Sequence, residues 1–193
     1  MKKLTFYALI AIVAISTVAF VNTKNTTVEN EIPTDDFVEF LAGAKSYTIE
    51  LAELMPADKY TTRPHDSVRS FGEQMAHIGM SSKFLLDIFV KGGPMPTRED
   101  FAAAAKMEKE MGANKEECIK TINATFQYIE DTYKGMDEAA MKETFTVPFD
   151  PKQPKFAKSK AFDFIRDHMI HHRGQALVSL RMQGVKAPAY RLY

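Results

Sequence analysis

Hydrophobic residues recur every three or four positions in four long stretches of the chain, with polar residues between them. This spacing is typical of α-helices that bury one face. A fifth, shorter stretch is rich in alanine and also has helical spacing. The predicted long helices cover residues 35–54, 70–89, 114–135 and 159–184, and the short helix covers residues 98–110.

Capping residues mark where these helices begin. Ser70-Phe71-Gly72-Glu73 is a capping-box pattern, in which a serine and a glutamate satisfy backbone groups at the start of a helix. Short polar side chains at other boundaries predict further N-caps. The predicted caps are Thr34 or Asp35 for the first long helix, Asn114 for the third and Ser159 for the fourth.

The connection between the third and fourth long helices, residues 136–157, contains three prolines and has no sustained periodicity. Only residues 144–147 within it are expected to be extended. Four long amphipathic helices with almost no strand signal predict an all-α fold, and a four-helix bundle is the simplest way to bury their apolar faces. The connection is long enough to cross one end of that bundle.

The N-terminal residues differ from the rest of the chain. A short basic start is followed by a mainly apolar run up to Val21 and then by polar residues. This order is typical of a secretory signal peptide, and an uncleaved membrane anchor is the alternative. Export to the periplasm or the extracellular space is expected, with membrane attachment only if the segment is retained. The expected parts are the signal peptide or anchor (1–19), a linker (20–34) and one helical domain (35–193).

Composition narrows the class of protein. Hydrophobic residues make up 45% of the chain and charged residues 26%, which is typical of a globular protein. Lys+Arg and Asp+Glu are both 25, and this balance argues against a nucleic-acid partner. Cys118 is the only cysteine, so no intramolecular disulfide can form. With no histidine near it in sequence, Cys118 is interpreted as a small buried hydrophobic residue rather than a catalytic thiol.

Three of the five histidines lie between residues 168 and 172. His168 and His172 are four positions apart and therefore share one helix face. His77 lies beside the apolar stripe of the second long helix. Three imidazoles with no fourth protein ligand describe a metal site with open positions, which zinc, nickel, manganese or iron could occupy. The alternative is that all three are hydrogen-bonded core residues.

Other polar residues near these histidines have weaker roles in this interpretation. His171 points about 100° away from its neighbours, which suits a supporting or surface residue. Arg173 and Gln175 could orient a ligand or substrate, or occupy ordinary polar positions. No carboxylate that could act as a general base is evident beside the histidines. Glu73 is as readily a helix-capping carboxylate as a site residue. Asp167 is expected to form surface ion pairs, and His65 is expected to lie in a solvated loop.

Several metal and haem motifs are missing from the sequence. It contains no His-Glu-x-x-His motif of the zinc proteases, no Glu-x-x-His motif of di-iron bundles and no Cys-x-x-Cys-His motif for covalent haem. Those three classes of protein are therefore excluded.

Two longer motifs carry a resemblance to a known family. Residues 54–64 with Val68-Arg69-Ser70-Phe71-Gly72-Glu73-Gln74-Met75-Ala76-His77-Ile78 resemble the entry to the second helix of the DinB/YfiT-like superfamily. His168-x-x-x-His172-Arg173-Gly174-Gln175 and residues 180–188 resemble that family's last helix. The resemblance covers about residues 35–190. It implies a four-helix bundle, often dimeric, with a divalent metal held at the positions of His77, His168 and His172.

Family members with known activities use low-molecular-weight thiols, whose pKa a metal would lower. This chain departs from the family in its expected export signal, since family members are mostly cytoplasmic. Reduced thiols are scarce outside the cytoplasm, which counts against thiol transfer here. The expected function is a metal-dependent enzyme acting on a small molecule, with catalytic residues unassigned. Hydrolysis and thiol-dependent S-transfer are the two reactions considered, and a non-catalytic metal- or ligand-binding bundle is the alternative. A pocket beside the metal, lined by the first helix and loops, would favour an enzyme.

Overall fold

The structure is a computed structural model that describes residues 34–191. The predicted signal peptide or anchor and nearly all of the predicted linker lie outside the described residues. None of the helices within 34–191 is long and apolar enough to span a membrane. The elements are α2 (Thr34–Leu54), the 3-10 helix η1 (Ala57–Lys59), α3 (Phe71–Phe89), α4 (Arg98–Gly112), α5 (Lys115–Lys134), α6 (Glu138–Lys142), β1 (Thr144–Thr146), β2 (Lys155–Ala157) and α7 (Ser159–Met182).

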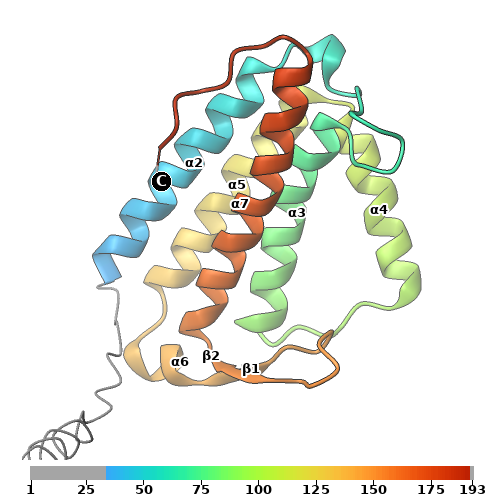
Figure 1. Ribbon diagram of the computed structural model, residues 1–193. Helices are drawn as coiled ribbons and strands as arrows, with labels where there is room; N and C mark the ends of the chain where they lie inside the picture. The colour runs from blue at the N-terminus through green and yellow to red at the C-terminus, as the bar shows by residue number, and fades with distance from the viewer. Residues whose placement is uncertain (1–33, 192–193) are drawn as a thin grey trace, which may run out of the picture. The chain divides into compact units, whose positions relative to one another are not determined.

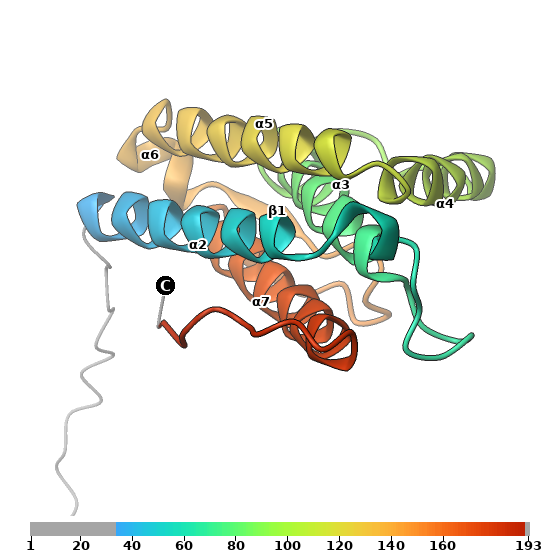
Figure 2. The ribbon, with the colours of Figure 1, turned by 90° about the horizontal axis from the view of Figure 1, so that it is seen from above.

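The four long predicted helices are confirmed as α2, α3, α5 and α7, which pack side by side as a bundle (Figure 1). Helices α2 and α7 run in one direction, and α3 and α5 run in the other. Because α3 and α5 are parallel, the chain must return between them, and α4 makes that return. Seen from above, α4 lies outside the group of four, beside α3 (Figure 2).

The predicted apolar faces form the core of this bundle. Leu51, Ile122 and Ile165 come from three different helices and are at most 1% exposed. Phe162 packs edge-on against Phe37, with ring centroids 5.3 Å apart. Burying one such side chain contributes about 1.5–3 kcal/mol, so the bundle is held mainly by these faces.

The capping-box prediction is confirmed at the start of α3. The Ser70 hydroxyl accepts from the Glu73 backbone N–H at 3.2 Å, and the Glu73 carboxylate accepts from the Ser70 N–H at 2.9 Å. Asn114 caps α5 as predicted. The Ser159 cap is wrong: Ser159 is the first residue of α7, and Lys158 before it makes no side-chain cap. Lys158 is instead held by Glu143, through its backbone N–H at 2.7 Å and its ammonium at 2.7 Å.

The connection before α7 contains more structure than its sequence predicts. The expected extended piece is β1, and it pairs antiparallel with β2, with Phe145 opposite Phe156. Neither β2 nor α6 was expected, because three and five residues are too short to show a period. Phe145 stacks on Phe89 of α3 with ring centroids 4.5 Å apart, which holds the hairpin against the end of the bundle.

Candidate metal centre

Packing of α7 against α3 brings together the three histidines of the predicted site. One nitrogen from each of His77, His168 and His172 lies within 4.8 Å of the others. The ring centroid of His77 is 5.3 Å from that of His168 and 4.3 Å from that of His172. Three imidazole nitrogens gathered this closely could hold a single transition-metal ion after small side-chain movements.

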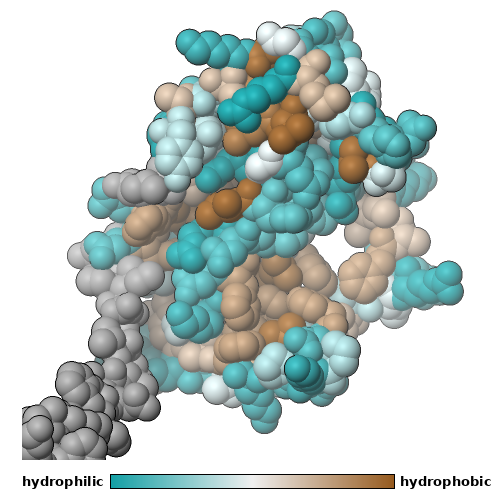
Figure 3. Space-filling model, in the orientation of Figure 1, coloured by the Kyte–Doolittle hydropathy of each residue, from teal (hydrophilic) through white to brown (hydrophobic). Residues whose placement is uncertain are grey.

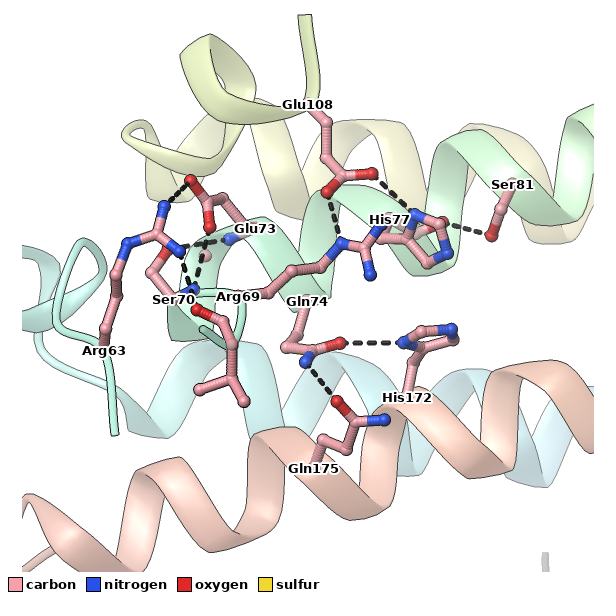
Figure 4. A network of polar contacts seen from close by, with 12 residues as sticks. Arg63, Arg69, Ser70, Glu73, Gln74, His77, Ser81, Glu108, His172 and Gln175 are labelled. Atoms are coloured by element: carbon pink, nitrogen blue, oxygen red, sulfur yellow. Dashed lines mark hydrogen bonds and ion pairs between the residues drawn. The ribbon is translucent and has the colours of Figure 1, made fainter. Parts of the chain in front are cut away.

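Hydrogen bonds at Nδ1 orient the rings of His77 and His168, and the partners of these bonds lie on α4 and α3. His77 Nδ1 lies 2.6 Å from a Glu108 carboxylate oxygen (Figure 4). His168 Nδ1 lies 3.4 Å from the Ser81 hydroxyl oxygen, which donates its own proton to the His77 carbonyl at 2.5 Å. Because Nδ1 is engaged on each ring, Nε2 is the nitrogen left for a metal.

A chain of amides fixes the third ring. Gln74 donates to Gln175 at 2.6 Å, and Gln175 donates to His171 Nε2 at 2.7 Å. The Gln74 carbonyl oxygen therefore faces His172 and accepts from its Nδ1–H at 2.8 Å (Figure 4). In a neutral His172 this direction of donors places the ring proton on Nδ1 and leaves the lone pair on Nε2, which is the form that binds a metal.

Burial keeps two of the histidines uncharged. It lowers the pKa of His168 to about 4 and that of His172 to about 3, with a further contribution from the charge of His77. Both rings are therefore neutral near pH 7. A metal needs the neutral form, so this environment suits ligation.

Sequence reasoning missed Glu108 and Arg69. The sequence shows no carboxylate beside the histidines, but in the structure Glu108 reaches them from α4. Its two oxygens accept from His77 and, at 2.5 Å, from Arg69 Nε (Figure 4). Burial raises the pKa of Glu108, but the hydrogen bonds from His77 and Arg69 outweigh that effect and lower it overall. No local signal links Glu108 to a histidine 31 positions away.

Some of the remaining polar candidates hold a histidine in place, and the others make contacts away from the site. Gln175 supports His172 through Gln74, and His171 is the exposed end of that chain. Arg173 is buried away from the histidines, with its guanidinium 4.6 Å from the centre of the Tyr47 ring on α2. Surface or capping contacts account for the others: Glu73 also pairs with Arg63, Asp167 pairs with Arg166, and His65 bonds Ser67.

Cys118 is fully buried, as its sequence context predicted. Its thiol lies 3.3 Å from the Met111 carbonyl oxygen. Burial raises the pKa of the thiol to about 12. Because the thiolate is the reactive form, Cys118 is not suited to nucleophilic chemistry.

A cavity of about 1030 Å³ opens directly beside the histidines. His77, His168, Glu108 and Arg69 form part of its lining, and most of the remaining wall is apolar. The walls come mainly from α3, α4, α7 and the hairpin segment, and the first long helix, α2, contributes none of the lining residues. Figure 3 shows the hollow between α4 and the body of the molecule, with apolar side chains around it. We call this cavity the cleft.

Fold and site together define a helical-bundle protein with an open three-histidine centre. The chain belongs to the DinB superfamily, whose family model matches residues 41–176. Comparison with curated protein sequences gives no match.

Solved structures show the same fold at low sequence identity. YfiT from Bacillus subtilis, described as a probable metal-dependent hydrolase with an unusual four-helix bundle topology, is 14% identical, with a TM-score of 0.65 over 86% of this chain and 95% of its own. A DinB-like protein from Bacillus cereus is 12% identical, with a TM-score of 0.64 over 81% and 97%. A mycothiol-dependent maleylpyruvate isomerase is 11% identical, with a TM-score of 0.55 over 74% and 60%.

Proposed function

We propose that this protein is a metal-dependent enzyme acting on a small molecule, with hydrolysis as its reaction class. One divalent transition metal would be held by His77, His168 and His172. The observation that carries the proposal is the meeting of three imidazole nitrogens within 4.8 Å, with two of the three histidines, His77 and His168, lining a cleft of about 1030 Å³. A metal with three protein ligands supplies Lewis acidity at the coordination positions left open to water and substrate.

Side chains around the ligands have positioning roles in this proposal. Glu108 and Gln74 hold the rings of His77 and His172 at Nδ1, which directs Nε2 inward and raises the basicity of the ligand. Both oxygens of Glu108 already accept hydrogen bonds. We therefore assign Glu108 to ring orientation, and Arg69 to attraction of negative charge on a substrate.

Thiol-dependent S-transfer is the second candidate. Its support is the likeness in fold to a mycothiol-dependent isomerase. Two features count against it here. The expected export signal would bring the protein to a compartment poor in reduced thiols, and the cleft offers few polar partners to a hydrophilic thiol.

Metal analysis of the purified protein tests the site. We expect about one divalent metal per chain and its loss in His168→Ala, because two remaining imidazoles bind weakly. His65→Ala is the control, since it removes an exposed loop histidine whose imidazole bonds Ser67 and which takes no part in the site. A wild-type protein that takes up no zinc, nickel, manganese or iron would contradict the proposal, as would full metal retention in His168→Ala.

Turnover of a panel of small esters and amides by the metal-loaded protein tests the reaction class. Activity should disappear in His168→Ala and persist in the control His65→Ala. A metal-loaded protein that is active only with an added thiol would support S-transfer instead. No turnover under either condition would favour the non-catalytic metal-binding alternative.

A further inference from the structure

One wall of the cleft is an apolar face of α4. Phe101, Ala104, Ala105 and Glu108 all line the cleft, and their spacing places them on one side of the helix. Phe101 is 49% exposed and faces Phe84 of α3, with ring centroids 6.1 Å apart. The apolar side chains therefore begin one to two turns below the carboxylate that holds His77.

The floor of the cleft is also apolar. Phe149 and Phe156 come from the hairpin segment and are 56% and 36% exposed. Phe156 packs against Phe164 of α7, with ring centroids 5.1 Å apart. Exposed aromatic side chains that gather in one concave surface are typical of a binding site. Single apolar residues scattered over a surface are common, whereas a contiguous apolar patch marks a place where a partner or ligand binds.

Charge is distributed unevenly along the cleft. At the histidine end, the proposed divalent metal together with Arg69 would outweigh the single negative charge of Glu108. In the apolar part, Lys83 is neutralised by Asp87 at 2.5 Å. The two further carboxylates of the lining, Asp100 and Asp150, accept backbone hydrogen bonds from Thr97 and Lys152. The histidine end is thus suited to an anion, and the rest to an uncharged body.

The dimensions indicate an extended ligand. Phe84 is seven residues along α3 from His77, which corresponds to about 10 Å along the helix axis. A volume of about 1030 Å³ is at the upper end of ordinary ligand sites and far exceeds what a small hydrophilic acid would fill. A compact polar ligand would leave the phenylalanines exposed.

We propose that the cleft binds an amphipathic anion, with an acidic head group at the histidine centre and an aliphatic or aromatic body along the phenylalanines. The inference rests on the proposed function for its head-group contact, and it names the substrate class of that site. A medium-chain carboxylate is the simplest molecule of this class.

Calorimetric titration of the metal-loaded full chain tests the proposal with three probes. Octanoate has both parts, propanoate has only the head and octanol has only the body. Octanoate should bind at least about tenfold more tightly than propanoate, because each buried methylene strengthens binding about fourfold. It should also bind more tightly than octanol, and this advantage should vanish when the metal is removed.

A pair of tryptophan substitutions locates the binding. Ala104→Trp fills the cleft and should weaken octanoate at least about tenfold. Ala103→Trp is the matched control, because Ala103 is exposed on the same helix but does not line the cleft. Both positions are exposed, so both variants should fold, and circular dichroism is the check. Equal octanoate binding in the two variants would overturn the proposal.

Further outcomes separate this proposal from the proposed function. Metal binding without any octanoate binding overturns the cleft assignment and leaves the metal-dependent enzyme intact. Octanoate binding that the metal does not strengthen overturns the head-group contact. A dimer in solution that Ala104→Trp dissociates would assign the cleft to a second copy of the chain and also overturn the proposal.

Discussion

Helix α3 meets two of its neighbours, α7 and α4, in opposite ways. Against α7 it packs along a continuous buried face, and the ligand positions of the proposed metal lie at that seam. Against α4 it makes close contact near the C-terminal end of α4 and then leaves a cleft. The comparison shows how one bundle provides both rigidity and space: the tightly packed pair positions the histidines, and the loosely packed pair admits a ligand.

The sequence of α4 explains its loose packing. Among its residues only Gly112 is buried, and its large apolar side chains Phe101 and Met107 are 49% and 54% exposed. Alanines favour the helix itself but offer little apolar area to bury. A capping box at Thr97 and Asp100 stabilises the free end. The helix is therefore stable locally without packing onto α3 along its whole length.

Side-chain truncations in α7 and in α4, on the two sides of α3, should differ most in their effect on the free energy of unfolding. Ile165 of α7 is 1% exposed, so Ile165→Ala should lower the free energy of unfolding by about 3 kcal/mol through lost burial and a residual cavity. Phe101→Ala on α4 should change it by less than about 0.5 kcal/mol, because the ring is already half in water. Urea denaturation measures both values. Equal losses would show that α4 contributes to the core as much as α7 does.

The contact point between α3 and α4 should respond to a single methyl group. A Cβ at Gly112 would lie 2.6 Å from the Glu73 backbone nitrogen, and neither backbone can yield without separating the helices. Gly112→Ala should therefore cost about 2 kcal/mol of stability and weaken binding in the cleft. Gly174→Ala is the control, because nothing lies within 4 Å of its Cβ position. An unchanged Gly112→Ala protein would contradict the close contact.

Glu108 joins the two regions, and its removal should affect the site more than the fold. Glu108→Ala should weaken metal binding about 10–100-fold, because His77 loses the acceptor that orients it. Stability should change little. Glu110→Ala is the matched control on the same helix, since Glu110 is exposed and pairs with Lys106. Competition with a chelator measures both affinities, and equal values would remove Glu108 from the site.

Local features of the chain predicted the helices well. The capping box at Ser70 and Glu73 and the spacing of His168 and His172 are determined within one or two turns, so they can be read directly from sequence. The predictions failed where a distant segment decided the local structure. Lys158, held by Glu143, occupies the position before α7 without capping it, and β2 exists because β1 lies beside it.

The sequence by itself determined the long helices, their apolar faces and the shared face of His168 and His172, because helix periodicity is a local property. Only the tertiary structure decided that His77 meets that pair, that Glu108 reaches them from α4, and that a cleft lies between. Those contacts join residues 31 or more positions apart. They depend on which helices pack closely and which do not. The volumes of the side chains that meet across the bundle determine this packing.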